Sequence, residues 1–370
     1  MNLILGDCLE KLKELPDNSV DSIVTDPPYG LSFMGKKWDY DVPSIEIWKE
    51  ALRVLKPGGH LLAFGGTRTY HRLVVNIEDA GFEIRDCIQW LYGSGFPKSH
   101  NIKEGNFKGW GTALKPANEP ICVARKPLEK GLTVAENVLK WGCGAINIER
   151  SRIGSEVRSY SINAAVTSGN FGNGANQPAD ERDSKTVQGR WPANIILDEV
   201  AAEMLDEQSG NIKGSKASGL TPTKARSNMN ASIAGINRTG YEDSGGASRF
   251  FYVAKASKSE RNTGLEGMPK VSKGHLASES GGGGGWSKDS DKNPNLPREN
   301  HHPTVKPIKL MKYLIKLVTP PNGVVLDLFM GSGSTGVATK SLGFNFIGIE
   351  LSQEYFEIAQ KRIDFNESSL

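Results

Sequence analysis

Short apolar segments of strand length recur near both ends of this 370-residue chain. They lie at residues 2–5, 20–25, 60–65, 84–91, 119–125, 323–328 and 344–349. Between several of them, apolar side chains recur on one helical face, at residues 44–55, 308–318 and 351–363. Strands that alternate with helices predict an α/β fold, with a seven-stranded, doubly wound parallel sheet covered on both faces.

The middle of the chain has a different pattern, because the alternation stops near residue 130 and resumes near residue 303. This part is rich in Gly, Ser and Asn and holds two strand-like segments, at residues 194–197 and 249–254. The pattern is typical of an inserted recognition region with long loops. The alternative is a disordered linker, and aromatic side chains such as Trp191 and Phe250 argue against it.

We therefore predict three segments. Residues 1–130 and 301–370 form the two halves of one α/β domain, and residues 131–300 are inserted between them. The last two strands, at residues 323–328 and 344–349, are too few to form a stable sheet. They must pair with the N-terminal strands, so we expect the two ends of the chain to meet.

Basic residues are unevenly distributed, although the net charge of the chain is only +3. Residues 98–130 hold seven Lys and Arg against three acidic residues, and residues 301–325 hold four Lys and no acidic residue. A basic stretch favours a phosphate backbone as partner. A solvated lysine surface explains the charge alone about equally well.

The four cysteines are far apart and form no CxxC pair, so we expect neither a zinc site nor a disulfide framework. No run of about 18 apolar residues indicates a membrane span. The N-terminal residues lack the basic start and long apolar segment of a signal peptide. These features predict a cytoplasmic protein without a bound metal.

A glycine-rich turn follows the strand that ends at Asp327, with Gly331 and Gly333 before the next helix. Glycines let a backbone turn sharply and approach a ligand closely. Glu350 ends the next strand, where an acid can accept hydrogen bonds from ribose hydroxyls. The turn could also begin a dinucleotide site or simply connect two elements. The spacing lacks the third glycine of the dinucleotide fingerprint and little chain follows Glu350, so S-adenosylmethionine is the better ligand.

If the ends of the chain meet, the donor site is divided between residues near 330 and residues 5–30. Asp7 lies at the end of the first strand and is a candidate to bind the adenine ring of the donor. A cap for a helix over residues 9–15 explains Asp7 about equally well, and both roles can hold together.

The tetrapeptide Asp26-Pro27-Pro28-Tyr29 follows the second strand. An exocyclic amine on adenine or cytosine is a poor nucleophile, because its lone pair is delocalised into the ring. Hydrogen bonds from the amine to the Asp26 carboxylate and the Pro27 carbonyl would localise that lone pair. Proline presets the loop, and Tyr29 offers a flat face for a base extruded from a duplex. Alone, Asp-Pro-Pro is often only a turn after a strand, but the glycine loop favours methyl transfer.

These motifs resemble the amino-methylating DNA methyltransferases of restriction–modification systems and phages. The order of motifs, chemistry first and cofactor last, resembles the permuted subgroup called the β class. Asp26 to Gly30 is similar to the catalytic motif of that family, and Asp327 to Thr335 to its donor loop. His302 to Pro307 resembles the segment before that loop, and Gly6 to Cys8 resembles its adenine-binding turn.

The resemblance implies a Rossmann-like methyltransferase sheet, circularly permuted, with a large inserted target-recognition region. It implies transfer of a methyl group from S-adenosylmethionine to adenine N6 at a specific site in double-stranded DNA. Aspartate at position 26 favours adenine, since cytosine N4 enzymes of this family more often carry serine there. Cytosine N4 remains the alternative; methylation of RNA or a protein amide, or an inactive DNA-binding relative, fits less well. A second copy of the chain is a candidate partner in a homodimer.

The interpretation assigns every candidate residue a role. The catalytic residues are Asp26, Pro27, Pro28 and Tyr29. The cofactor-binding residues are Asp7, Cys8, Thr304, Lys306, Asp327, Phe329, Gly331, Ser332, Gly333, Thr335 and Glu350. The residues expected to contact DNA are Lys98, Arg190, Trp191, Arg249, Lys255 and Lys258.

Overall fold

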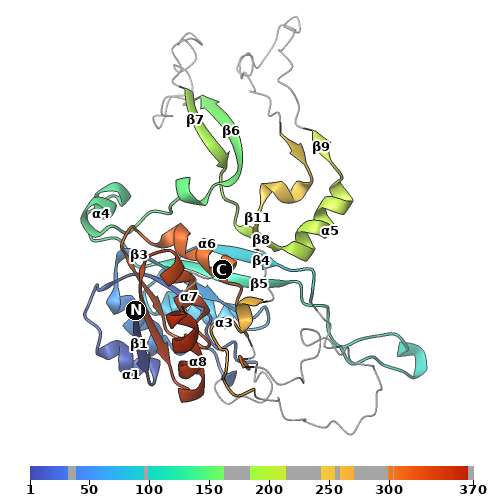
Figure 1. Cartoon of the computed structure of the whole chain (residues 1–370), viewed down its shortest axis with the longest axis horizontal. Helices are drawn as coiled ribbons and strands as arrows, with labels where there is room; N and C mark the ends of the chain where they lie inside the picture. Colours follow the sequence, from blue (N-terminus) through green and yellow to red (C-terminus); the bar gives the residue numbers. More distant parts are fainter. Residues whose placement is uncertain are drawn as a thin grey trace, which may run out of the picture.

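A nine-stranded sheet forms the centre of the molecule (Figure 1). The computed structural model describes residues 1–31, 39–95, 99–161, 184–213, 243–254, 259–270, 299–302 and 304–365. The sheet contains, in spatial order, β1 (Asn2–Leu5), β13 (Asn345–Glu350), β12 (Val324–Asp327), β2 (Val20–Thr25), β3 (Leu55–Phe64), β5 (Asn118–Arg125), β4 (Glu83–Leu91), β8 (Ile195–Asp198) and β11 (Tyr252–Ala254). The α/β fold is confirmed, and all seven predicted strands belong to this sheet.

The sheet is wider than predicted, because the middle of the chain contributes β8 and β11. β8 pairs in parallel with β4, and β11 pairs in parallel with β8. The apolar residues of β8 explain the extension, since Ile196 is fully buried against the edge of the sheet. Pairing with β8 also covers the backbone groups that β4 would otherwise expose at an edge.

All neighbouring strands are parallel except β5, which runs antiparallel to both β3 and β4. The prediction of a wholly parallel sheet is therefore wrong at this strand. Because β5 is reversed, β4 and β5 form a long hairpin, and residues 92–117 connect them at the same edge of the sheet where β2 and β12 end.

The two ends of the chain meet in the sheet, as predicted. β1 pairs in parallel with β13, and β12 lies between β13 and β2. The carboxyl ends of these four parallel strands lie at one edge of the sheet, where ligands bind in open α/β folds. Thr25, at the end of β2, donates a hydrogen bond of 2.7 Å from Oγ1 to Asp327 Oδ1, at the end of β12.

Helices cover both faces of the sheet. One core packs Leu12, Trp48 and Leu73 of three helices against the face that carries Ile23. The other core packs α6 and α7 against the face that carries Val24. The helices of the body are α1 (Cys8–Lys13), α2 (Ile45–Val54), α3 (Tyr70–Asp79), α6 (Ile308–Val318), α7 (Ser334–Ser341) and α8 (Gln353–Asp364). In the described part of the chain, no helix is long and apolar enough to cross a membrane.

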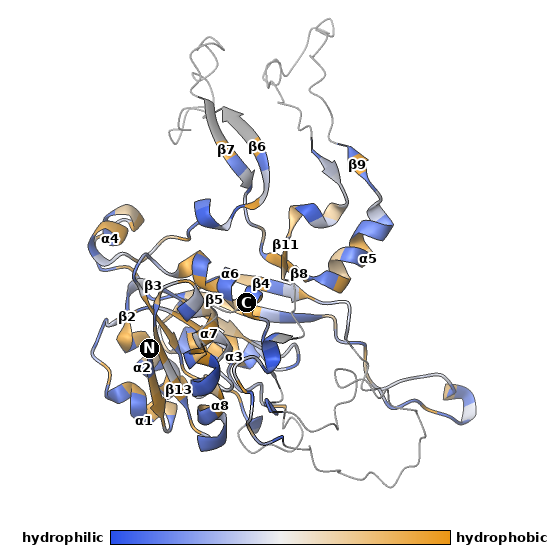
Figure 2. Cartoon of the chain, viewed as in Figure 1, coloured by the Kyte–Doolittle hydropathy of each residue, from blue (hydrophilic) through white to orange (hydrophobic). Residues whose placement is uncertain are grey.

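The middle of the chain forms two arms that project from the body (Figure 1). One arm is the antiparallel pair β6 (Ile153–Ser161) and β7 (Ser184–Arg190). The other contains α5 (Glu199–Ser209) and the short pair β9 (Ile212–Lys213) and β10 (Ser244–Gly245). Figure 2 shows that apolar residues are concentrated in the body, whereas the arms carry many polar residues.

The remaining described elements are short or lie between the body and the arms. They are α4 (Val134–Trp141) and the single-turn helices η3 (Gly105–Phe107), η4 (Glu149–Ser151), η6 (Ala247–Phe250) and η7 (Ser259–Arg261). Among them, α4 begins with a capping box, in which Thr133 and Glu136 satisfy each other's backbone N–H groups.

Candidate active site

A cavity of about 670 Å³ opens at the carboxyl edge of the sheet. Its walls contain the ends of four strands, marked by Asp7, Asp26, Asp327 and Glu350. This volume lies in the range of sites for small molecules and cofactors. The chain segments that sequence analysis assigned to catalysis and to the donor therefore line one cavity.

The tetrapeptide after β2 is held in place by Asp39, a residue that sequence analysis did not select. Asp39 is buried, and its Oδ1 accepts hydrogen bonds from the backbone N–H groups of Tyr29 at 2.6 Å and Gly30 at 3.0 Å. Thr69 also donates from Oγ1 to the Tyr29 carbonyl at 2.5 Å. The loop that presents Asp26 is thus fixed by side chains from two other segments.

Four side chains form a buried polar cluster, here called the catalytic cluster: Asp26, Tyr29, Glu119 and Lys306. Lys306 Nζ lies 2.7 Å from Asp26 Oδ2 and 3.2 Å from Glu119 Oε2. The Tyr29 hydroxyl donates to Asp26 Oδ1 at 2.8 Å and lies 3.2 Å from Glu119 Oε2. Each oxygen of Asp26 therefore has a donor that fixes its direction.

Burial is the largest single influence on the pKa values of Asp26, Tyr29 and Lys306. It raises the pKa of Asp26, although the nearby Lys306 ammonium acts in the opposite direction. Burial and the two carboxylates raise the pKa of Tyr29, so its hydroxyl stays protonated. Burial alone would lower the pKa of Lys306, but Asp26 and Glu119 outweigh it and the pKa is raised. The cluster thus holds two carboxyl groups against one ammonium group.

Lys306 and Glu119 make contacts that the sequence did not indicate. Lys306, predicted to lie beside the donor, lines the cavity, and its ammonium group contacts the Asp26 carboxylate directly. Sequence analysis gave Glu119 no role. The signal that could have selected it is an acidic residue directly before the apolar run at residues 120–124 of β5.

Asp327 organises the donor side of the cavity. Its Oδ1 accepts from Thr25 at 2.7 Å, and its Oδ2 accepts from the Thr335 hydroxyl at 2.5 Å. The Phe329 N–H also donates to Oδ1, at 3.1 Å. Burial raises the pKa of Asp327 to about 6, against the effect of these hydrogen bonds. The carboxylate joins the ends of β2 and β12 to the first turn of α7.

The glycine loop has the backbone conformation that the sequence predicted. Gly331 and Gly333 have positive φ angles of +53° and +80°, which favour glycine. The Gly331 N–H donates to Glu350 Oε2 at 2.8 Å, and Ser352 N–H donates to Glu350 Oε1 at 2.8 Å. A Cβ atom on Gly331 would lie 2.9 Å from His302 Nε2. The loop is therefore tied to the end of β13 and closely packed.

Asp7 caps a helix, as one of its two predicted roles required, and its binding of the donor adenine stays a prediction. Its Oδ1 caps α1 by accepting from Leu9 N–H at 2.9 Å and Glu10 N–H at 3.3 Å. The residue also lines the cavity, as does Cys8. Burial, followed by the Asp7 charge, raises the pKa of the Cys8 thiol to about 12.

The structure brings most of the predicted donor residues together. Gly333 does not line the cavity; a Cβ atom there would lie 3.0 Å from Ala359 of α8. The predicted donor residues that do line the cavity are Asp7, Cys8, Thr304, Lys306, Asp327, Phe329, Gly331, Ser332, Thr335 and Glu350.

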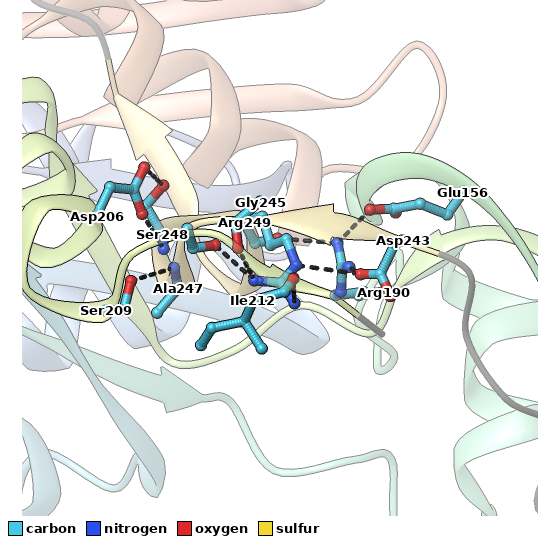
Figure 3. Close-up of polar contacts among 11 residues, drawn as sticks. Glu156, Arg190, Asp206, Ser209, Ile212, Asp243, Gly245, Ala247, Ser248 and Arg249 are labelled. Carbon is cyan, nitrogen blue, oxygen red and sulfur yellow. Dashed lines mark hydrogen bonds and ion pairs between the residues drawn. The ribbon is translucent and has the colours of Figure 1, made fainter. Parts of the chain in front are cut away.

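Two arginines predicted to contact DNA lie in a largely buried ionic cluster between the arms (Figure 3). This arginine cluster contains Glu156, Arg190, Asp243 and Arg249. Arg190 pairs with Glu156 at 2.7 Å and with Asp243, and only 5% of it is exposed. Arg249 Nε lies 3.2 Å from the same Asp243 carboxylate. The cluster joins β7 to the segment that precedes β11.

Arg190 and Arg249 thus make ion pairs within the protein, and their contact with DNA stays a prediction. Arg249 Nη1 donates to the carbonyls of Gly245 at 2.6 Å and Gly246 at 2.7 Å, so its guanidinium is engaged within the protein. Both arginines also lie over the Phe250 ring. Trp191 is 64% exposed and remains a predicted DNA contact. The predicted contacts Lys98, Lys255 and Lys258 lie outside the described residues.

Comparison with known proteins gives matches along most of the chain. A family model described as DNA methylase, of the N6 and N4 methyltransferases, matches residues 20–361. The Type II methyltransferase M.BglI of Bacillus subtilis is 25% identical over 367 residues, which covers 97% of this chain and 84% of that protein. M.HindIII of Haemophilus influenzae is 28% identical over 195 residues, covering 38% of this chain and 63% of M.HindIII. The chain thus spans less than two thirds of that relative.

Solved structures with full-length matches have low sequence identity. The PvuII DNA methyltransferase, described as cytosine-N4-specific, is 16% identical and has a TM-score of 0.49. The match covers 100% of this chain and 87% of the PvuII chain. M1.HpyAVI is 18% identical, with 99% of both chains covered and a TM-score of 0.44. The family match, in contrast, spans both halves of the site and the region between them. This chain belongs to the DNA methylase family of N6 and N4 methyltransferases.

Proposed function

We propose that this protein transfers a methyl group from S-adenosylmethionine to the N6 amine of adenine at a specific site in double-stranded DNA. The observation that carries the proposal is the position of the Asp26 carboxylate. It lies in the catalytic cluster on the wall of the same cavity that the glycine loop lines. A base amine and a methyl donor can therefore meet in one enclosed space.

The residues of the cavity fit this donor. When bound, S-adenosylmethionine supplies an electrophilic methyl group on a positively charged sulfur. Burial lowers the pKa of His302 in the wall to about 3, so this side chain is neutral at pH 7. Acidic side chains therefore dominate the wall against one lysine, Lys306, and favour a cationic ligand; they are Asp7, Asp26, Asp39, Asp41, Glu119, Asp327 and Glu350. Glu350 has the position expected for a partner of ribose hydroxyls.

The catalytic cluster fits the chemistry of an amine. Asp26 would accept one N–H of the amine and the Pro27 carbonyl the other, which localises the nitrogen lone pair. Lys306 and the Tyr29 hydroxyl hold the carboxylate in one orientation, so it needs no rearrangement when the amine arrives. Tyr29 also offers its ring to an extruded base. Adenine rather than cytosine rests on aspartate at position 26, and the resemblance supports it.

Selection of the DNA sequence is proposed for the inserted residues 131–300. The two arms project from the body beside the sheet, and the arginine cluster fixes their bases to each other. Loops on a rigid scaffold commonly carry recognition. A chimera with the insert of another family member should methylate the site of that member, and continued methylation of the original site would place recognition elsewhere.

Analysis of modified DNA tests the proposed reaction. The protein is produced in a host without adenine methylation, the DNA is digested to nucleosides, and mass spectrometry should find N6-methyladenine. Sequencing of modified positions then gives the recognised site. N4-methylcytosine alone would overturn the adenine assignment and leave the mechanism standing. A methyl group on a ring carbon would overturn both, because the tetrapeptide has no thiol to attack the ring.

Asp26→Ala is the matched variant for this experiment. We expect it to lose at least a hundredfold in turnover, as preorganised catalytic groups typically contribute about 10²–10³. Donor affinity, measured by calorimetry, should stay nearly unchanged because Asp26 contacts the amine. Turnover within tenfold of wild type, about 1.4 kcal/mol in barrier height, would contradict the assignment of Asp26.

A further inference from the structure

The hairpin between β4 and β5 extends far from the body (Figure 1). Its outer part, residues 99–115, is here called the aromatic arm. Ile102 N–H donates to the Trp110 carbonyl at 2.8 Å, and His100 N–H donates to Thr112 Oγ1 at 2.9 Å. The single turn η3 lies within it, at Gly105–Phe107. The arm is thus closed by hydrogen bonds of its own.

Two aromatic rings lie exposed on the arm. Phe107 and Trp110 meet edge to face, with ring centroids 5.1 Å apart. In spite of this contact, 55% of Phe107 and 62% of Trp110 is exposed. Isolated exposed apolar residues are common, but two large rings paired on a projecting arm mark a contact surface.

The charge around these rings is positive. Lys103, Lys108 and Lys115 are exposed on the arm, against one acidic residue, Glu104. Aromatic rings among lysines are typical of surfaces that bind nucleic acid, in which the rings stack on bases and the lysines contact phosphates.

The hairpin that carries the arm begins and ends at the active-site cavity. Tyr92 lines the cavity where the hairpin leaves β4, and Pro116 and Glu119 line it where the hairpin returns. Tyr92 N–H donates to the Ala117 carbonyl at 2.9 Å, and Lys115 Nζ donates to the Gly93 carbonyl at 2.7 Å. The base of the hairpin therefore lies beside Glu119 of the catalytic cluster along the chain.

We propose that the aromatic arm binds the DNA duplex at the target base pair. Phe107 and Trp110 stack in the space that the extruded base leaves, beside the base that has lost its partner. This inference rests on the proposed function, because it requires a base to leave the helix. Extrusion costs a few kcal/mol, and aromatic wedges between base steps stabilise distorted duplexes in other proteins. The lysines of the arm neutralise nearby phosphates.

A second copy of the chain fits the arm less well. The aromatic arms of two copies would repel each other because each has a net positive charge. The phosphate backbone of a duplex attracts the same arm. The base of the hairpin lies at the cavity, which also fits a partner that must enter the cavity.

Duplex binding by ring variants tests the proposal. Phe107→Ala with Trp110→Ala should bind a duplex that contains the methylated site at least about fivefold more weakly than wild type, by fluorescence anisotropy. Phe107→Tyr with Trp110→Phe keeps both rings and should retain most of the affinity. Donor affinity should be unchanged in both variants. Wild-type duplex affinity in the folded double alanine variant would overturn the proposal, as would a loss of self-association without any change in DNA binding.

A chemical probe tests stacking directly. Permanganate oxidises thymines that are not stacked, and thymine is the partner of a target adenine. At saturating protein, the orphaned thymine should be protected in wild type and more reactive with the double alanine variant. Equal reactivity would overturn the stacking. Lys103→Gln with Lys108→Gln should reduce the salt slope of binding by about two, at about 0.9 per phosphate contact.

Failure of the arm and failure of the proposed reaction are distinguishable. Binding to random-sequence duplexes measures the arm without turnover. If host DNA carries no methylated base and the ring variants still lose duplex affinity, the reaction is wrong and the arm as a DNA-binding surface stands. If host DNA is methylated and the ring variants bind like wild type, the arm proposal alone is wrong.

Discussion

The catalytic cluster and the arginine cluster are both buried ionic networks, yet they differ in balance and access. The arginine cluster sets two arginines against two carboxylates, Glu156 and Asp243, and fills the space between the arms. The catalytic cluster sets one lysine against two carboxyl groups, Asp26 and Glu119, and lines a cavity. A balanced network away from a cavity holds segments together. An unbalanced network on a cavity wall can accept a further donor, such as a base amine.

Removing the shared carboxylate of the arginine cluster should have the largest effect on stability. Asp243→Ala leaves two arginines without their common partner, and breaking a buried ion pair typically costs about 3–5 kcal/mol. Chemical denaturation should show the loss, and hydrogen exchange should place it in residues 184–213. Donor affinity should not change. Glu10→Ala, which breaks an exposed pair with Lys13, is the control. A loss no larger than in the control would mean that the arginine cluster does not hold the arms.

The pH dependence of stability should identify Asp327. Its folded-state pKa is raised from 3.8 to about 6, so the folded protein holds this proton more tightly than the unfolded chain. The stabilisation is fully present below pH 3.8 and is lost as the pH rises through about 6. The change corresponds to about 3 kcal/mol. Asp327→Asn should therefore lose less stability than wild type between pH 4 and 6, measured by thermal unfolding. Parallel curves for the two proteins would contradict this assignment.

Replacing one cation in each cluster by methionine should show that the catalytic cluster affects the rate and the arginine cluster affects stability. Lys306→Met removes the ammonium group that lowers the pKa of Asp26, so Asp26 would take up a proton at higher pH. The acid limb of kcat/KM against pH should move upward, with at least a tenfold loss of rate at neutral pH, about 1.4 kcal/mol. Arg190→Met should lower stability and leave the acid limb in place. If both variants moved the acid limb alike, the contrast between the clusters would be wrong.

The smallest expected effect is on donor affinity, and a comparison of valine variants at two glycines should measure it. Gly331→Val and Gly343→Val both place valine at a positive φ, +53° and +74°. Strain of this kind costs about 1–3 kcal/mol. Nothing lies within 4 Å of a Cβ atom on Gly343, whereas one on Gly331 meets His302. Calorimetry should show at least tenfold weaker donor binding for Gly331→Val and little change for Gly343→Val. Equal affinities would argue that the loop does not hold the donor.

Local patterns in the sequence were sufficient for the strands and for the two motifs. Apolar runs gave the seven strands of the catalytic domain, and glycines with positive φ marked the loop at Gly331. The pairing of Lys306 with Asp26 and Glu119 was not predictable, because these residues meet only through the order of strands in the sheet. An acidic residue in a strand carries no local sign of its partner.

The ion pairs of the two arginines could not be predicted from the sequence for a related reason. Arginine beside aromatic residues has the same local sequence whether it faces a phosphate or a buried carboxylate. Asp243 decides the matter for Arg190, and it lies 53 positions away along the chain. The aromatic arm shows the opposite case. Its basic stretch was visible in the sequence, but the exposure of Phe107 and Trp110 depends on the reversed direction of β5.

The pairing of β1 with β13 has a consequence for the synthesis of the protein. Asn2 leaves the ribosome long before its partner Ile347, because most of the sequence described here lies between them. The floor of the cavity needs both strands, so a nascent chain that carries Asp26 has no complete donor site until synthesis passes Glu350. Domains generally fold as units during synthesis, but in this domain β1 cannot pair until β13 has been synthesised. A chain that stops short of Glu350 therefore lacks part of the cavity wall, and such long-range closure should make folding slow.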